Sequence, residues 1–331
     1  MAMNQKRLEK IVELHFKNKL SQTEIAELLG LSQTTVSRSI KKAEERGLIQ
    51  AYLNDVYTNE VTKKRQLICE KYGLKAVLIL LHTDIYSSEG MPFLTRLGEL
   101  GAKYVEKILK DSIRIAVAHG RTLFFLIKAL QERRMNCQIT PLTLMRGIDL
   151  EEGKIPAAIN AIFLAGKFWR DYNWDEQLPV FRADINNKSI TEIVKSMSEE
   201  PYVKESLERI KNCDLLLTSV GPLYKESTIV RGAEKMGISF AELAKAGVVG
   251  TICHTPVDIN GKPSKFTELN KLPISVPLSD IKKLSLDEKR DVILVSGGIE
   301  KREIIRTALM GNYCNVLVTD APVADFLLRE N

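Results

Sequence analysis

The first fifty residues space their apolar side chains three or four positions apart, as an amphipathic helix does. Residues 5–16 carry one such stripe and predict a first helix. Ser21 and Glu24 form the pattern of a capping box, in which each side chain accepts a hydrogen bond from a free amide, so a second helix begins there. Gly30 follows that helix and predicts its end, because glycine readily adopts the left-handed conformation of a helix terminus.

A third helix is predicted to start after a Ser32 cap, to bury Val36, Ile40 and Ala43, and to end at Gly47. Two helices joined by a tight glycine-containing turn form a helix-turn-helix, whose second helix enters the major groove of DNA. Its outward amide and hydroxyl groups suit base edges, and its cations suit phosphates. The expected DNA-binding residues are Gln33, Thr34, Thr35, Ser37, Arg38, Lys41 and Lys42.

The next segment, Leu48–Leu53, alternates apolar and polar residues and predicts a short wing strand. Any amphipathic helix has a polar outer face, and serine or threonine at a helix start can be a cap and nothing more. Two capped helices, a Gly-Leu turn, a buried Val36 and a local positive charge nevertheless agree with one another. The N-terminal segment is therefore interpreted as a DNA-binding module.

Beyond residue 54 short β-rich runs recur between helical stretches. This alternation predicts an α/β fold with a mostly parallel sheet and helices on both of its faces. The expected strands are Ala76–His82, Ile113–Ala118, Gln138–Leu144, Leu178–Phe181, Asp214–Val220, Val248–Cys253, Asp291–Ser296 and Asn315–Thr319. The expected helices are Pro92–Leu109, Thr122–Leu130, Ile155–Arg170, Ile190–Lys211, Ala233–Ala246, Arg302–Met310 and Ala321–Arg329.

The length of 331 residues and the 44% apolar content fit two domains, predicted here as 1–54 and 55–331. The net charge is +6, and residues 1–50 hold nine Lys and Arg against six Asp and Glu, so this small module carries half of the excess. Five scattered cysteines argue against disulfides and structural zinc, and no metal or cofactor is expected. Without a signal peptide or a membrane span, the protein is expected to be cytoplasmic.

Ligands of such sheets bind beyond the carboxyl ends of the strands, so the loops that follow the strands are the candidate site. Two loops combine glycine, a cation and a helix start, and both resemble cradles for an anion. The first contains Gly120, Arg121 and Thr122; the second contains Gly297, Gly298 and Lys301.

Further candidates follow other strands. Arg146 and Gly147 come after one strand, and Gly250 lies in another. Asp258 could contact a ligand or simply start a turn. Asp320 could contact a ligand or simply cap the last helix. A small anionic ligand would need these amides and cations to converge at one point of the sheet edge.

The chain resembles the SorC family of sugar-responsive bacterial transcriptional regulators over nearly its full length. The resemblance is carried by Leu20–Gln50, Ser112–Leu123, Ala246–Cys253 with Asp258–Gly261, and above all Val292–Ala324 with its GGxxK and ALxGxxxNVLVTD patterns. It implies a winged helix-turn-helix joined to an effector domain similar to sugar-phosphate isomerases. It also implies a homotetramer on paired double-stranded operator sites, and a phosphorylated sugar as effector, held by the two glycine loops and by Arg146 with Gly147.

The chain departs from the family pattern in its expected pocket. Thr251 stands where an acidic residue is common, so one carboxylate contact to sugar hydroxyls is missing. Residues 254–257 (HTPV) replace the usual aromatic pair and leave a smaller, more polar wall. Met145 and Arg146 stand where some relatives trap an aldehyde on a lysine, so effector binding is expected to be reversible and non-covalent.

The function predicted from the sequence is a sequence-specific DNA-binding regulator, not an enzyme. One alternative is an active sugar-phosphate isomerase or hydrolase with a DNA tether, which needs a positioned base. The candidates for it are Asp258, Asp320 and His119, which form no recognisable pair, so no catalytic residue is assigned. The other alternative is a DNA-architectural protein with a vestigial ligand pocket.

Overall fold

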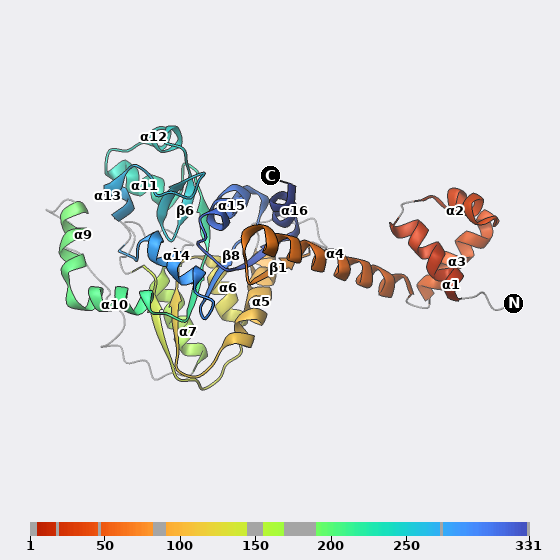
Figure 1. The fold of residues 1–331 in the computed structure, drawn as a ribbon, viewed down its shortest axis with the longest axis horizontal. Helices are drawn as coiled ribbons and strands as arrows, with labels where there is room; N and C mark the ends of the chain where they lie inside the picture. The colour runs from red at the N-terminus through yellow and green to blue at the C-terminus, as the bar shows by residue number, and fades with distance from the viewer. Residues whose placement is uncertain are drawn as a thin grey trace. The chain divides into compact units, whose positions relative to one another are not determined.

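The computed structural model describes residues 5–17, 20–45, 48–81, 91–143, 155–168, 190–271 and 274–329 (Figure 1). The chain divides into two compact units, Met1–Lys64 and Arg65–Asn331. Helix α4 (Leu48–Tyr72) belongs to both units, so the predicted boundary after residue 54 falls inside a helix.

The first unit contains the three predicted helices. They are α1 (Gln5–Val12), extended by the short π-helix η1 (Glu13–Lys17), then α2 (Gln22–Leu29) and α3 (Gln33–Glu45). Their apolar stripes meet in one core, as the spacing predicts. This core consists of Ile11, Leu14, Ile25, Ala26 and Val36, with Leu20, Leu29, Leu31 and Ile40 partly buried against it.

The ends of α2 and the start of α3 have the predicted capping groups. Ser21 and Glu24 form the capping box: the Ser21 hydroxyl accepts from the Glu24 amide at 3.2 Å, and the Glu24 carboxylate accepts from the Ser21 amide at 2.7 Å. Gly30 ends α2 with a φ of 62°. The Ser32 hydroxyl accepts from the Thr35 amide at 3.1 Å and caps α3. The predicted helix end at Gly47 lies outside the described residues.

The predicted wing strand over Leu48–Leu53 is wrong. These residues are the first turns of α4. Six alternating residues also fit the start of a helix, and here the helix continues for 25 residues to Tyr72. The longer context therefore decides the conformation of a segment that is too short to decide it alone.

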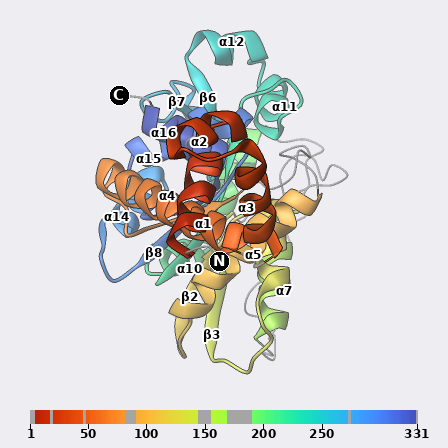
Figure 2. The ribbon, with the colours of Figure 1, turned by 90° about the vertical axis from the view of Figure 1, so that its right-hand side faces the viewer.

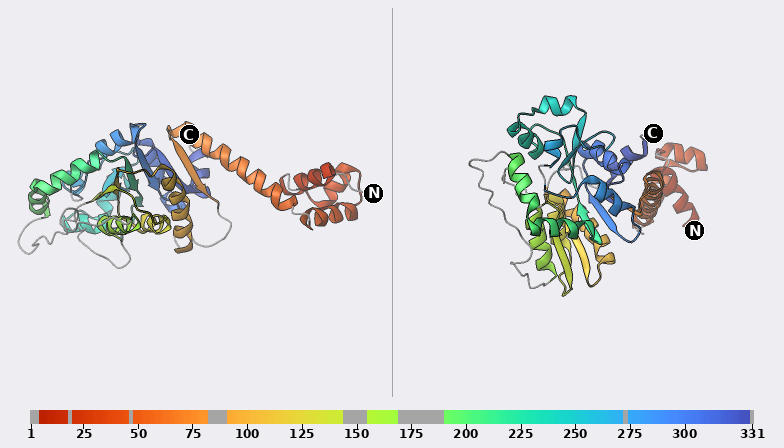
Figure 3. Two further views of the ribbon diagram at one scale, coloured as in Figure 1. Left: turned by 90° about the horizontal axis from the view of Figure 1, so that it is seen from below. Right: turned by 60° about the vertical axis from the view of Figure 1, so that its left-hand side comes forward.

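The second unit is built on a six-stranded, fully parallel sheet in the order β1-β9-β8-β4-β2-β3 (Figure 3). This confirms the predicted fold class. The strands are β1 (Ala76–Leu80), β2 (Ile113–Val117), β3 (Cys137–Pro141), β4 (Leu215–Thr218), β8 (Asp291–Val295) and β9 (Val316–Asp320). The strand predicted over Leu178–Phe181 lies outside the described residues.

Helices cover both faces of this sheet. Helices α5 (Met91–Ile108), α6 (Arg121–Ala129) and α7 (Ala157–Lys167) pack against one another beside it. Helices α10 (Pro201–Lys211), α14 (Leu278–Leu286) and α16 (Ala321–Arg329) contact its strands as well. The remaining described helices are α9 (Ile190–Glu199), α11 (Thr228–Lys235), α12 (Phe240–Lys245), α13 (Thr267–Lys271), the 3-10 helix η2 (Ile299–Lys301) and α15 (Arg302–Met310).

A second, antiparallel sheet was not predicted. It consists of β5 (Val220–Pro222), β6 (Val248–Ile252) and β7 (Thr255–Asp258), and Figure 2 shows β6 and β7 beside α11 and α12. Two predicted helices are each divided in two. Pro201 starts α10 immediately after α9, because proline lacks the amide that a continuous helix needs, and Gly237 with a φ of 76° separates α11 from α12.

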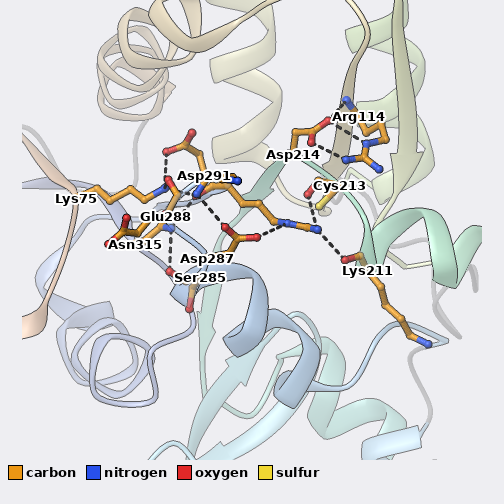
Figure 4. Close-up of polar contacts among 12 residues, drawn as sticks. Lys75, Arg114, Lys211, Cys213, Asp214, Ser285, Asp287, Glu288, Asp291 and Asn315 are labelled. Carbon is orange, nitrogen blue, oxygen red and sulfur yellow. Dashed lines mark hydrogen bonds and ion pairs between the residues drawn. The ribbon is translucent and has the colours of Figure 1, made fainter.

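Polar contacts join the strands at the amino edge of the large sheet (Figure 4). The Arg114 guanidinium donates to both carboxylate oxygens of Asp214, at 2.7 and 3.0 Å. The Asn315 amide group donates to the carbonyl oxygens of Ser285 and Arg290, both at 2.9 Å. These groups are used within the protein, which leaves the opposite, carboxyl edge as the place to look for a ligand site.

Candidate functional site

The outward face of α3 carries the polar side chains that the sequence predicts. Side chains four residues apart lie in a row along a helix, so Gln33, Ser37 and Lys41 form one row, and Thr34, Arg38 and Lys42 form a second row beside it. Val36 and Ser39 are fully buried on the other side. Of the seven predicted DNA-binding residues, Gln33, Thr34, Ser37, Arg38 and Lys41 are exposed, and Thr35 and Lys42 are half-buried.

Thr35 differs from its neighbours because its hydroxyl is used within the helix start. Its Oγ1 lies 2.7 Å from the hydroxyl oxygen of Ser32, and its amide donates to the same oxygen. Thr35 therefore completes the cap of α3. A substitution of Thr35 would disturb the helix as well as any contact with a base, so Arg38 is the cleaner probe of this surface.

Three segments that follow strands of the parallel sheet, together with Leu94 of α5, line a cavity of about 150 Å³ in the second unit. The first is the turn from β2 into α6, the second is the end of β4 with the start of β5, and the third is η2. Every segment follows a strand of the parallel sheet, at the carboxyl edge where ligands bind in such folds. The lining residues are Leu94, His119, Gly120, Arg121, Thr122, Ser219, Val220, Gly221 and Lys301.

The charge of this cavity suits an anion. Arg121 and Lys301 both line it, and no carboxylate is among its lining residues. The first turn of α6, which begins at Arg121, adds backbone amides and the positive end of the helix dipole. Thr122, only 6% exposed, lines the same cavity.

The turn before α6 is held by Asn160, a residue that the sequence analysis missed. Asn160 is fully buried in α7, and its amide group donates to the carbonyl oxygens of Ala118 at 2.9 Å and Gly120 at 3.3 Å. The Gly120 amide donates to the Ile155 carbonyl oxygen at 2.8 Å. A single asparagine within an otherwise apolar helical run was the available signal, because a buried amide needs partners.

The second glycine loop is organised by Asp320. This fully buried carboxylate accepts from the Gly298 amide at 3.0 Å and from the Val323 amide at 3.3 Å. Asp320 is thus the cap of α16 and also fastens the glycine loop to β9. The sequence predicts that the glycine amides hold an anion, whereas the amides of Gly298 and Gly120 donate to protein oxygens here. The first turn of α6 is the better source of amide donors.

Several predicted site residues lie away from this cavity. Gly250 does not line it, and a Cβ there would come 2.4 Å from the Gly221 carbonyl oxygen, so its small size lets β6 approach β5. The Asp258 carboxylate accepts hydrogen bonds from the amides of Asn260 and Lys262, both at 2.9 Å, so Asp258 starts a turn. Gly297, Gly298 and Asp320 are buried and are not among the lining residues, and Arg146 and Gly147 lie outside the described residues.

Five lining residues were not predicted as part of the ligand site: Leu94, His119, Ser219, Val220 and Gly221. The last three directly follow β4, so the end of a strand followed by a small residue could have indicated them as site residues. The His119 ring stacks on His254, with the ring centroids 3.5 Å apart and the planes 16° from parallel. Among the described residues, no cluster of three or more His, Cys, Asp or Glu could hold a metal ion.

Comparison with known families divides the chain in the same way. Residues 57–329 match the Sugar-bind family model, which describes a sugar-binding domain, and residues 17–50 match the model of a winged helix-turn-helix DNA-binding domain. Together the two models account for most of the chain.

Individual relatives match along nearly their whole lengths. The sorbitol operon regulator of Klebsiella pneumoniae is 25% identical over 97% of this chain and 96% of its own length. The deoxyribonucleoside regulator of Bacillus subtilis is 27% identical over 96% and 95%. The crystal structure of the full-length Klebsiella regulator SorC has the same fold, with a TM-score of 0.66, 24% identity and 98% coverage of both chains.

Proposed function

Because this chain belongs to the SorC family of transcriptional regulators, which join a helix-turn-helix to a sugar-binding domain, we propose that a phosphorylated sugar is the effector that controls its binding to operator DNA. The observation that carries the proposal is the convergence of Arg121, Lys301 and the first turn of α6 on one cavity without a carboxylate. A phosphate dianion is held well by cations and backbone amides together.

The size of the cavity supports a small anionic group. A cavity of about 150 Å³ holds several water molecules, which is enough room for a phosphate group. The rest of a sugar would extend toward Ser219 and His119, whose side chains can hydrogen-bond to hydroxyl groups.

The DNA side of the proposal rests on α3. Its exposed Gln33, Thr34 and Ser37 offer hydrogen-bonding groups for base edges, and Arg38 and Lys41 offer cations for phosphates. The stable cap at Ser32 and the buried opposite face hold these side chains on a rigid element, which sequence-specific recognition requires.

We also propose that the second unit binds its sugar without turning it over. Two of the three candidate bases already serve the fold: Asp258 accepts two amides of its turn, and Asp320 accepts the amides of Gly298 and Val323. The residues that line the cavity, His119 among them, include no carboxylate, which is a poor arrangement for the isomerase or hydrolase alternative.

A homotetramer in the cytoplasm is the expected working form. Two recognition helices must meet two operator half-sites about 34–36 Å apart, or multiples of that distance, which one copy of the chain cannot do. No helix of the described residues combines the length and the apolar character needed to cross a membrane.

A thermal-shift measurement on the full chain tests the effector proposal. Sugar phosphates, the matching free sugars and inorganic phosphate are each added; sorbitol 6-phosphate and deoxyribose 5-phosphate come first because of the names of the two relatives. A ligand at one hundred times its dissociation constant adds about 2.7 kcal/mol to the stability of the native state. Stabilisation by at least one sugar phosphate and not by its free sugar is expected. Equal stabilisation by the two would contradict the phosphate assignment.

A further inference from the structure

The turn between β6 and β7 holds two side chains in a backbone conformation that favours glycine. Ile252 pairs with Thr255, so Cys253 and His254 form a two-residue loop, with φ values of 50° and 65°. Loops of this type prefer Asn-Gly or Gly-Gly, because glycine takes a positive φ without steric cost. Two strained residues in succession indicate that their side chains have a task.

Both side chains fasten the turn to the walls of the anion cavity. The Cys253 sulfur lies 3.3 Å from the hydroxyl oxygen of Thr218, which directly precedes the lining residue Ser219. Burial raises the pKa of the Cys253 thiol to about 12, so this contact is made by a neutral group. The His254 ring lies flat on His119, another lining residue, 3.5 Å between centroids.

We propose that His254 is a specificity-determining residue that positions His119 for the sugar part of the effector. The proposal rests on the proposed phosphate-binding role of the cavity. Because the His254 ring covers one face of His119, the stack fixes the orientation of an imidazole that lines the cavity, and imidazole nitrogens form hydrogen bonds with hydroxyl groups. The ligand class is a phosphorylated polyhydroxy compound, because Arg121 and Lys301 suit its phosphate and the side chains of Ser219 and His119 suit its hydroxyl groups.

The strained backbone gives this proposal an unusual signature. His254→Gly removes the ring but also relaxes the φ of 65°. Such a change stabilises a chain or leaves it neutral when the lost side chain is not needed for folding. The melting temperature is therefore expected to stay the same or to rise by about 2 °C. Loss of the ring stack weakens binding of the sugar phosphate by roughly three- to tenfold.

The test is calorimetric titration of the full chain with inorganic phosphate, ribose 5-phosphate, fructose 6-phosphate and AMP. His254→Asn is the matched variant, because asparagine tolerates a positive φ but does not stack, and His254→Phe retains a ring that can cover His119. The Gly and Asn variants are expected to lose affinity for the sugar phosphate but to bind inorganic phosphate like the native chain. The Phe variant is expected to retain most of the native affinity.

The outcomes separate this inference from the proposed function. Binding of a sugar phosphate by the native chain together with unchanged affinity in the Gly and Asn variants overturns the role of His254 alone. A lower melting temperature without a change in affinity assigns His254 to the fold and also overturns it. AMP bound as tightly as the best sugar phosphate overturns the ligand class. If the native chain binds neither inorganic phosphate nor any sugar phosphate, the proposed function fails, and this inference fails with it.

Discussion

We expect effector binding to depend most on the side chains of Lys301 and Arg121. Each brings a full positive charge to the cavity, and a hydrogen bond to a charged group contributes about 1.5–3 kcal/mol. Lys301→Ala and Arg121→Ala should each weaken binding of the sugar phosphate by about ten- to a hundredfold, as measured by calorimetry. Lys128→Ala is the control, because Lys128 is exposed in the last turn of the same helix α6. Equal losses in all three variants would show that general charge, not this cavity, attracts the ligand.

Asp320 should be more important for stability than for ligand contact. Asp320→Ala leaves the buried amides of Gly298 and Val323 without their acceptors, which is expected to cost roughly 2–4 kcal/mol in urea unfolding. Asp320→Asn keeps one acceptor oxygen and should lose less. An alanine variant with the native unfolding midpoint would mean that water replaces the carboxylate at no cost.

Individual residues were predictable where the signal is local. The turn before α6 and Lys301 stood out because glycine and a cation precede a helix start, and they do line one cavity. The partners of Gly298 and Gly120 were not predictable, because Asp320 and Ile155 reach these amides only through the order of the strands and loops in space. Glycines in a sequence indicate where the backbone can approach another group closely, but they do not identify that group.

Helices α5 and α6 are held close together by a glycine that should not tolerate a methyl group. A Cβ at Gly98 would lie 2.6 Å from the Leu126 amide nitrogen in the facing helix. Gly98→Ala is expected to lower the free energy of unfolding by about 1–3 kcal/mol and to weaken effector binding, because α6 carries the anion cavity at its first turn.

The matched control for Gly98→Ala is Gly166→Ala in α7. A Cβ at Gly166 meets no heavy atom within 4 Å, so alanine should raise stability by about 0.5–1 kcal/mol through its helix propensity. Chemical denaturation measures the change in the free energy of unfolding for both variants. Gly98→Ala as stable as the native chain would show that the two helices separate freely, and the account of their packing would be wrong.

Whole elements were predictable where the hydrophobic period was long. The six described parallel strands and α5 follow directly from the alternation of buried runs and helical stripes. The wing was mispredicted because Leu48–Leu53 is too short to distinguish a strand from the start of α4. Strand β7 (Thr255–Asp258) was missed because it is four residues long, contains Pro256 and is defined by its pairing with β6.

At the scale of the whole sheet, we expect the ion pair at its amino edge to determine how the stability of the protein responds to acid. Hydrogen bonds from the Arg114 guanidinium hold the pKa of Asp214 below its ordinary value. The stabilisation is therefore complete above about pH 4, the pKa of the unfolded chain, and is lost as the pH falls through the lower pKa of the folded state. Because Arg114 is partly exposed, the expected effect of Asp214→Asn at pH 7 is only about 1 kcal/mol.

The measurement for this prediction is urea unfolding between pH 7 and pH 2. The difference between the native chain and Asp214→Asn should shrink below pH 4. Glu205→Gln is the control, since Glu205 pairs with Arg209 on the surface of α10 and its substitution should change stability little at any pH. A difference for Asp214→Asn that persists unchanged at pH 2 would exclude the ion pair as its cause.

The two units of the molecule have separate tasks that only the whole chain can combine. One unit carries the exposed face of α3, and the other carries the cavity around Lys301. Regulation requires a coupling free energy between them: the sugar phosphate must change the affinity for DNA, and DNA must change the affinity for the sugar phosphate by the same factor. Such coupling is typically about 5- to 150-fold.

The most direct test of this account is the DNA affinity of the full chain with and without its sugar phosphate, measured by fluorescence anisotropy on an operator selected from random duplexes. The native chain should change its affinity at least fivefold when the sugar phosphate is added. Lys301→Ala should bind the same DNA but show little change at that concentration, and Arg38→Ala should bind the sugar phosphate but lose the DNA. A response to the sugar phosphate that survives in Lys301→Ala at full strength would contradict the central claim.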